Sequence, residues 1–317
     1  MSQERLSESA VGAMLGCAVG DAVGELAFEL RSRNDLMATA ARLPVLRYTD
    51  DTVMAIALAE SLIATGALDA GDLGDRFARH YEAEPWRGYG PGPPRIFEEV
   101  AETGISYAEA ARKLYKGEGS LGNGAAMRIA PLGVALFDDL ERLYEAACAS
   151  AEVTHAHPEG QDGAAIQATA VALATRHHVA GTALDPAAAA ARLAATARTD
   201  SIQAKMRIVE RAISEDWTPT EAADEIGRSV AVGESMPFAV YAFLRTPDDS
   251  LACKETAILN GGDRDTLGAM AMAISGAYLG PQGLRKVLTN RLERRDHIAD
   301  LGHQLAARFP LSGSAAG

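Results

Sequence analysis

The chain has 317 residues, of which 48% are hydrophobic, 23% charged and only 5% aromatic, and its formal net charge is −13. This composition is globular and excludes a disordered or collagen-like chain. The negative charge makes nucleic acid an unfavourable ligand. We expect one compact domain over residues 1–311 and a flexible C-terminal tail over residues 312–317 (SGSAAG).

Cysteine usage and apolar stretches indicate the compartment. Cys17, Cys148 and Cys253 form no CxxC or other metal-ligand spacing, and an odd number of distant thiols is a poor disulfide framework. The N-terminal sequence lacks the apolar core of a signal peptide. The apolar stretches 164–174 and 267–279 are shorter than the roughly 20 residues that span a bilayer. We therefore expect a cytoplasmic protein without a membrane-inserted segment.

Apolar residues spaced three and four apart predict helices along the chain, the first of them from Val11 to Ala22. Further helices are expected, in chain order, at 53–63, 144–153, 164–174, 202–213 and 267–278. Clusters of Gly and Pro predict loops at 87–94, 117–124, 157–163 and 260–262. No convincing run alternates like a strand, and the helix breaks follow no fixed period, so the expected fold class is all-α rather than a solenoid.

Two of the predicted helices begin with the same acidic pattern. The segment 49–52 (TDDT) precedes VMAIALAESLI, and the segment 261–266 (GGDRDT) precedes LGAMAMAISGAYLG. Helix capping is one interpretation, because Thr and Asp are favoured at helix starts. A cap needs one acceptor, however, whereas each start carries two carboxylates and at least one hydroxyl.

If these two helix starts face each other, four negative charges meet and repel unless cations neutralise them. The donors are all hard oxygens, which match Mg²⁺, Mn²⁺ or Ca²⁺ rather than Zn²⁺. The sequence therefore predicts a site for two divalent ions as the alternative to simple capping.

The segment 117–124, the glycine-rich loop, is a second candidate site. Gly117, Gly119 and Gly122 satisfy GxGxxG, but the preceding AEAARKLYK is helical in pattern, so the Rossmann context is missing. Such a loop can still turn backbone N–H groups toward a pyrophosphate. An ordinary turn between helices is the competing interpretation. His155 and His157 lack an HExxH pattern, and His155 is expected to cap a helix end or contact a ligand.

Taken in order, the motifs GAMLGCAVGDAVG, YTDDTVMA, RGYGPG, KGEGSLGNGAAMR, VTHAHPEG and GGDRDT resemble the ADP-ribosylglycohydrolase family, the family of the dinitrogenase-reductase-activating glycohydrolase. The resemblance runs from Gly12 to Gly280. The details YTDDT, RGYG and KGEGSLGNGAAMR are most similar to the serine-directed ADP-ribosylhydrolase branch, which also cleaves poly(ADP-ribose) and O-acetyl-ADP-ribose.

The resemblance implies a compact all-α fold with two Mg²⁺ (or Mn²⁺) ions in a cleft. The metal ligands implied are Thr49, Asp50, Asp51, Asp263, Asp265 and Thr266. The catalytic residues implied are Glu29 and Asp263. The substrate-binding residues implied are Tyr115, which would stack on adenine, with Gly119, Ser120, Gly122, Asn123, Gly124 and His155 around the diphosphate and distal ribose.

Three positions depart from the family pattern. The expected glutamate after GDAVG stands one residue late, at Glu29, and Glu25 is held in reserve for the same role. Leu121 occupies a position where the serine-directed branch can have an aromatic residue, which weakens stacking on adenine. Arg264 replaces the common Thr of GGDTDT, and a cation beside two metals is unfavourable unless it points away or pairs with an anion.

The function implied is a metal-dependent hydrolase that removes ADP-ribose from modified proteins, with the O-glycosidic serine linkage favoured and poly(ADP-ribose) or O-acetyl-ADP-ribose as further substrates. The alternatives are an arginine-directed ADP-ribosylhydrolase and a non-catalytic ADP-ribose-binding module. A purely structural helical protein is a third, although it has no use for six oxygen ligands at two helix starts. The expected partners are ADP-ribosylated proteins and free ADP-ribose, and the expected assembly is a monomer, because one cleft suffices.

Overall fold

The computed structural model describes residues 2–30 and 32–311, so the tail expected over 312–317 lies outside the described residues. The described chain is helical, and its only β-structure is two isolated bridges, Leu46 with Leu292 and Gly122 with Ala231. This confirms the all-α prediction. The helices are α1 (Gln3–Leu26), α2 (Arg33–Ala40), α3 (Asp50–Thr65), α4 (Ala70–Ala83), α5 (Gly92–Thr103), α6 (Tyr107–Gly117), α7 (Gly124–Met127), α8 (Ala130–Ala135), α9 (Leu140–Glu152), α10 (Pro158–Ala180), α11 (Pro186–Thr196), α12 (Asp200–Ser214), α13 (Pro219–Ile226), α14 (Val232–Arg245), α15 (Ser250–Leu259), α16 (Arg264–Leu279), the 3₁₀ turn η1 (Pro281–Gly283), α17 (Lys286–Thr289) and α18 (Arg295–Arg308).

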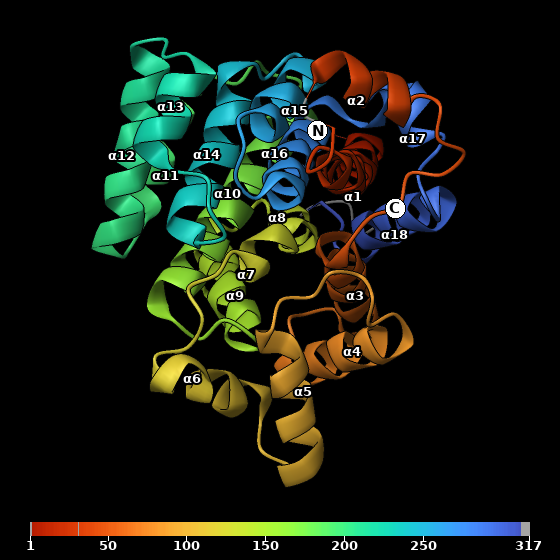
Figure 1. Cartoon of the computed structure of the whole chain (residues 1–317), viewed down its shortest axis with the longest axis vertical. Helices are drawn as coiled ribbons and strands as arrows, with labels where there is room; N and C mark the ends of the chain where they lie inside the picture. Colours follow the sequence, from red (N-terminus) through yellow and green to blue (C-terminus); the bar gives the residue numbers. More distant parts are fainter. Residues whose placement is uncertain (1, 31, 312–317) are drawn as a thin grey trace.

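Helices α1, α10, α14 and α16 form the centre of the molecule, α11 to α13 lie at one side, and α5 and α6 extend from the lower end (Figure 1). The six predicted helices all have counterparts, in α1, α3, α9, α10, α12 and α16. One predicted loop is wrong: residues 157–163 belong mostly to α10, which begins at Pro158. Proline is favourable at the first helical position because its missing N–H would have no helical partner there.

The contact between α1 and α16 determines where the acidic helix starts lie. Glycines recur every four residues along α1, and a Cβ atom on Gly16 or Gly20 would lie only 2.1 or 2.0 Å from the carbonyl oxygen of Met272 or Gly268. A Cβ on Gly268 would in turn lie 2.3 Å from the carbonyl oxygen of Gly20. The two helices therefore meet backbone to backbone, which only glycine permits. At the end of this contact, Gly24 packs against the first turn of α16.

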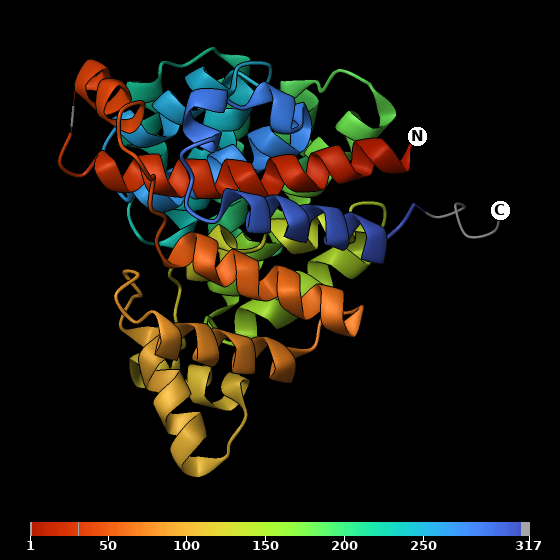
Figure 2. The same ribbon diagram turned by 90° about the vertical axis from the view of Figure 1, so that its right-hand side faces the viewer.

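Helix α1 is long and apolar enough to span a membrane by length and composition, and 89% of its apolar window is buried inside the protein. The sequence analysis considered only shorter apolar stretches and did not single out this one. In the structure α1 crosses the whole molecule with α18 beside it (Figure 2). Its burial is that of a central core helix. The three cysteines are free thiols.

Candidate active site

A cavity of about 270 Å³ opens between the starts of α3 and α16, the loop before α5 and the glycine-rich loop. It collects most of the residues that the sequence singled out: Asp50, Asp51, Tyr115, Ser120, Gly122, Asn123, Gly124, His155, Asp263, Asp265 and Thr266. Gly88, Gly90 and Pro91 of the RGYGPG segment line it as well. Thr49, Gly119 and Glu29 are not among the lining residues.

The capping interpretation fails for both acidic helix starts. Asp69, which precedes α4, accepts a hydrogen bond from a backbone N–H of the first helical turn, as does Asp139, which precedes α9. Within the described chain, the residues that precede α3 and α16, Thr49 and Asp263, make no such side-chain cap. Thr49 Oγ1 lies 2.9 Å from Asp21 Oδ1 and 3.1 Å from Asp51 Oδ2 instead. The side chains of Thr49 and Asp263 therefore do not cap the helices that follow them.

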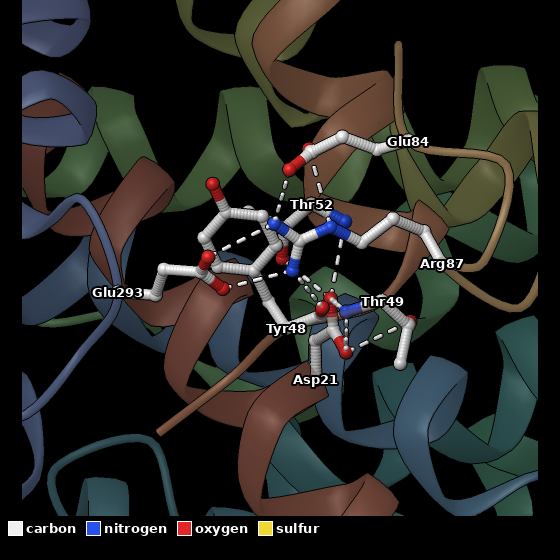
Figure 3. Close-up of polar contacts among 7 residues, drawn as sticks. All are labelled: Asp21, Tyr48, Thr49, Thr52, Glu84, Arg87 and Glu293. Atoms are coloured by element: carbon white, nitrogen blue, oxygen red, sulfur yellow. Dashed lines mark hydrogen bonds and ion pairs between the residues drawn. The ribbon is translucent and has the colours of Figure 1, made fainter. Parts of the chain in front are cut away.

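Asp21, near the C-terminal end of α1, holds the start of α3 in place, and the sequence analysis did not single it out. Its carboxylate is fully buried and accepts from the backbone N–H of Thr49 at 2.9 and 3.0 Å and from that of Thr52 at 3.1 Å. The Thr52 hydroxyl donates to it at 2.5 Å. Figure 3 shows Asp21 beneath this turn. Burial raises its pKa to about 6, although the four donors oppose that shift. The sequence feature that could have pointed to Asp21 is the presence of an aspartate inside an apolar helix.

Arg87, the first residue of RGYGPG, holds the same turn from the opposite side (Figure 3). Its guanidinium donates to the Tyr48 carbonyl at 2.9 Å and to the two carboxylate oxygens of Glu293 at 2.8 and 3.0 Å. It also pairs with Glu84 at 3.0 Å, and its carbon lies 4.6 Å from the centroid of the Tyr48 ring. The Arg87 carbonyl accepts from the backbone N–H of Asp50 at 2.8 Å. These contacts raise the pKa of Arg87 and tie the start of α3 to a segment more than 200 residues away.

Four carboxylates, which we call the acidic centre, meet at the cavity: Asp50, Asp51, Asp263 and Asp265. Burial, followed by the charges of Asp21 and Asp263, raises the pKa of Asp50 to about 7. Burial, followed by the charges of Asp263 and Asp21, raises that of Asp265 to about 8. Burial and the neighbouring carboxylates also raise the pKa of Asp51 well above its ordinary value. The acidic centre thus carries more negative charge than its protein surroundings neutralise.

The donor set of the acidic centre fits hard divalent cations. Asp51 Oδ1 is buried and has no hydrogen-bond partner in the described part of the chain, so a lone pair is left for another ligand. Carboxylate and hydroxyl oxygens are what Mg²⁺ and Mn²⁺ prefer. As the side chains stand, no group of three or more His, Cys, Asp or Glu among the described residues is arranged to hold an ion. Side-chain rotation would have to bring the oxygens together.

The glycine-rich loop follows a helix, as predicted, and forms the opposite wall of the cavity. Asn123 Nδ2 donates to Asp263 Oδ2 at 2.7 Å and to Ser235 Oγ at 3.2 Å, which connects the loop to the start of α16. A Cβ on Gly119 would lie 2.7 Å from the backbone nitrogen of His157, and one on Gly124 would lie 2.7 Å from His155 Cε1. The loop therefore packs directly on the segment that carries His155.

The three departures from the family pattern have clear positions. Glu25 is exposed in the last turn of α1, and its charge contributes to the raised pKa of Asp265. Glu29 is exposed in the turn that follows α1 and does not line the cavity. Arg264 donates from Nη1 to the Ile258 carbonyl at 2.9 Å, so its guanidinium is directed toward α15 and not into the cavity. Leu121 is exposed and lies outside the lining.

A helical fold with a cavity in which an acidic centre faces a glycine-rich loop defines the class of protein. A profile of the ADP-ribosylglycohydrolase family matches residues 2–315. The chain belongs to this family and is therefore an enzyme of the glycosyl hydrolase type.

Three relatives show the extent of the similarity. The chain is 34% identical to the ADP-ribosylhydrolase ARH3 of Bos taurus, over 85% of this chain and 84% of that protein. It is 27% identical to the ADP-ribosyl-[dinitrogen reductase] glycohydrolase of Rhodospirillum rubrum, over 99% of both chains. A solved structure described as an ADP-ribosylglycohydrolase-related protein complex matches with a TM-score of 0.72 and 25% identity, over 97% of this chain and 100% of that one.

Proposed function

We propose that this enzyme is a metal-dependent ADP-ribosylhydrolase that removes ADP-ribose from modified proteins, and that it prefers the serine linkage. The observation that carries the proposal is the acidic centre itself: two helix starts without side-chain caps, raised carboxyl pKa values and an unpartnered oxygen on Asp51. The 34% identity to the ADP-ribosylhydrolases ARH3 of Bos taurus and Homo sapiens supports the substrate class. Poly(ADP-ribose) and O-acetyl-ADP-ribose are further substrates under this proposal.

Two Mg²⁺ or Mn²⁺ ions would be held by Thr49, Asp50, Asp51, Asp263, Asp265 and Thr266. When bound, such ions neutralise the carboxylates, orient sugar hydroxyls and lower the pKa of a water molecule. The chain's own groups bind and orient the rest of the substrate. The N–H groups of Gly119, Gly122 and Asn123 are bonded within the protein, so the other backbone N–H groups of residues 119–124 would face the diphosphate. Tyr115, at the mouth of the cavity and 56% exposed, leaves a ring face for adenine.

Cleavage at the anomeric carbon passes through an oxocarbenium-like transition state, so the departing serine oxygen needs a proton and the carbon needs water from the other side. Asp263, oriented by Asn123 Nδ2 at 2.7 Å, is one candidate to move a proton. The second is a glutamate near the end of α1. The resemblance to the family favours Glu29, but the charge of Glu25 contributes to the raised pKa of Asp265, which favours Glu25.

We also propose a cytoplasmic monomer, and the three free cysteines support a reducing compartment. The deciding experiment follows ADP-ribose release from two peptides, one modified on serine and one on arginine, with Mg²⁺ and after chelation. Release from the serine peptide alone, lost on chelation, is the expected result. Release from the arginine peptide alone would move the enzyme to the arginine linkage. Binding of ADP-ribose without release would make it a non-catalytic reader.

Variants of the two glutamates separate their roles. Under this proposal Glu25→Gln lowers kcat by at least about tenfold and Glu29→Gln, its matched control in the same segment, leaves kcat within about twofold. The reverse order would assign the proton transfer to Glu29.

A further inference from the structure

A buried chain of three side chains leads inward from the cavity lining: His155, Thr154 and Arg128, of which His155 and Thr154 belong to the lining. Arg128 Nη1 lies 2.8 Å from Thr154 Oγ1, and the same hydroxyl oxygen lies 2.8 Å from His155 Nδ1. Arg128 and Thr154 are fully buried, and His155 is buried except where it lines the cavity. Sequence analysis identified His155 as a ligand contact but gave no role to the other two.

Arg128 cannot turn away from this position. Its Nη1 also donates to the Gly124 carbonyl at 3.1 Å, and its Nη2 donates to the Ser150 carbonyl at 2.9 Å. Its guanidinium carbon lies 4.5 Å from the centroid of the Phe77 ring. Arginine has only donors, so every partner of this guanidinium must accept. Thr154 Oγ1 therefore accepts a hydrogen from Arg128.

The direction of the next hydrogen bond follows from counting protons. A threonine hydroxyl has one hydrogen and two lone pairs. If the Thr154 hydroxyl donates to His155 Nδ1, its hydrogen and one lone pair are used. If Nδ1 carried the hydrogen instead, both lone pairs would be occupied and the buried hydroxyl hydrogen would have no acceptor among the contacts of the described residues. A buried donor without an acceptor is costly. The first arrangement is therefore favoured, with Nδ1 as acceptor and Nε2 protonated.

His155 Nε2 lies beside Gly122 and Gly124, which both line the cavity. A Cβ on Gly124 would lie 2.9 Å from His155 Nε2, and one on Gly122 would lie 3.5 Å from it. These two glycines leave the space that a ligand atom needs to reach the imidazole. Burial, with the Arg128 charge behind the ring, lowers the pKa of His155 to about 3, so the ring is neutral in the protein without ligand.

We propose that Arg128 and Thr154 are positioning residues that fix His155 in its Nε2–H tautomer, so that His155 meets the ligand as a neutral hydrogen-bond donor to an oxygen atom. The identity of the ligand, ADP-ribose, rests on the proposed function; the tautomer does not. A neutral donor selects an acceptor oxygen, such as that of a ribose hydroxyl or a phosphate, without adding a positive charge to the site.

The tautomer is tested by nuclear magnetic resonance of the ring nitrogens in protein labelled with ¹⁵N-histidine at pH 7, without ligand. The chain has 7 histidines, and His155→Gln identifies the signals of His155 by their loss. The expected result is a protonated Nε2 and an unprotonated Nδ1 in the wild type. A protonated Nδ1 in the wild type would overturn the proposal, and this measurement needs no Thr154 variant to fold.

Two variants test the role of Thr154. Thr154→Val keeps the shape and removes the hydroxyl, so His155 should become a mixture of both tautomers and ADP-ribose affinity, by titration calorimetry, should fall about tenfold. Thr154→Ser keeps the hydroxyl and should retain the tautomer and the affinity. The matched control is Thr169→Val, which removes another buried hydroxyl, one bonded within α10 to the Ala165 carbonyl. An unchanged tautomer in Thr154→Val would refute the positioning role.

The two proposals fail separately. A wild type that shows the Nε2–H tautomer, with its dependence on Thr154, but binds no ADP-ribose would leave the positioning role standing and remove the proposed ligand. A wild type that binds ADP-ribose with His155 protonated at Nδ1 would support the proposed ligand and remove the positioning role.

Discussion

Replacing Gly20 by alanine tests the helix contact that positions the acidic centre. The added Cβ would lie 2.0 Å from the Gly268 carbonyl oxygen, 2.3 Å from its carbonyl carbon and 2.9 Å from the Ala269 nitrogen. All three are backbone atoms, so no side chain can rotate to make room, and α1 and α16 must separate by about 1 Å. Overpacking of a core costs about 1–3 kcal/mol, and a backbone clash belongs at the upper end. Alanine regains about 1 kcal/mol through its helix propensity.

The net expectation is that the free energy of unfolding falls by about 2 kcal/mol or more in Gly20→Ala, measured by urea denaturation followed by circular dichroism. Gly71→Ala is the control: Gly71 is exposed in α4, and its added Cβ meets only one atom, at 3.4 Å. This variant should be more stable by about 0.5 kcal/mol. A Gly20→Ala protein as stable as the Gly71→Ala protein would refute the backbone-to-backbone contact.

Three further predictions concern charge. Asp51→Asn should be more stable than the wild type in a chelator, because burial and neighbouring carboxylates raise the pKa of Asp51. Under the proposed metal dependence, Mg²⁺ should stabilise the wild type but not Asp51→Asn in urea titrations. Burial lowers the pKa of Lys254 from 10.5 to about 8, so the unfolded chain binds more protons between these pH values and stability rises with pH across that window. Lys254→Met should therefore gain up to about 3 kcal/mol at pH 7, and an advantage over the wild type that did not shrink toward pH 10 would contradict this. Arg87→Lys loses the paired contacts with Glu84 and Glu293 and should lower both the unfolding free energy, by about 2 kcal/mol, and the rate of ADP-ribose release.

Sequence reasoning reached the acidic centre because its residues stand in two short, similar motifs. Asp50 and Asp51 are adjacent in the chain, as are the members of GGDRDT, and the charge argument needed only that two helix starts meet. The structure brings them to one cavity. The central parts of the helices could also be predicted from the sequence, because an apolar stripe at helical spacing is a local pattern.

Residues whose role depends on distant contacts were harder to find. Asp21 lies 28 and 31 residues before the two threonines that it holds, and Arg87 reaches Glu293 across 206 residues. No local pattern specifies such pairs. The choice of Glu29 over Glu25 depended on an assumed one-residue insertion after GDAVG, which a single sequence cannot decide. The predicted loop at 157–163 was wrong because Gly160 and Gly163 were interpreted as helix breakers. In the structure a Cβ on Gly160 would lie 2.7 Å from the Ser120 carbonyl oxygen, and one on Gly163 would lie 2.3 Å from Val232 Cγ2.

Contacts between residues that are distant in the chain also explain how the acidic centre stays together despite the repulsion between its carboxylates. Four carboxylates that repel one another would move apart if their helices were free to slide. The glycines of α1 and α16 prevent this, because a backbone-to-backbone contact over several turns has few alternative registers. Asp21 and Arg87 then fix the start of α3 from two sides. The helix packing thus maintains a concentration of negative charge that local interactions oppose, and under the proposed metal dependence side-chain rotation would turn its oxygens toward the cations.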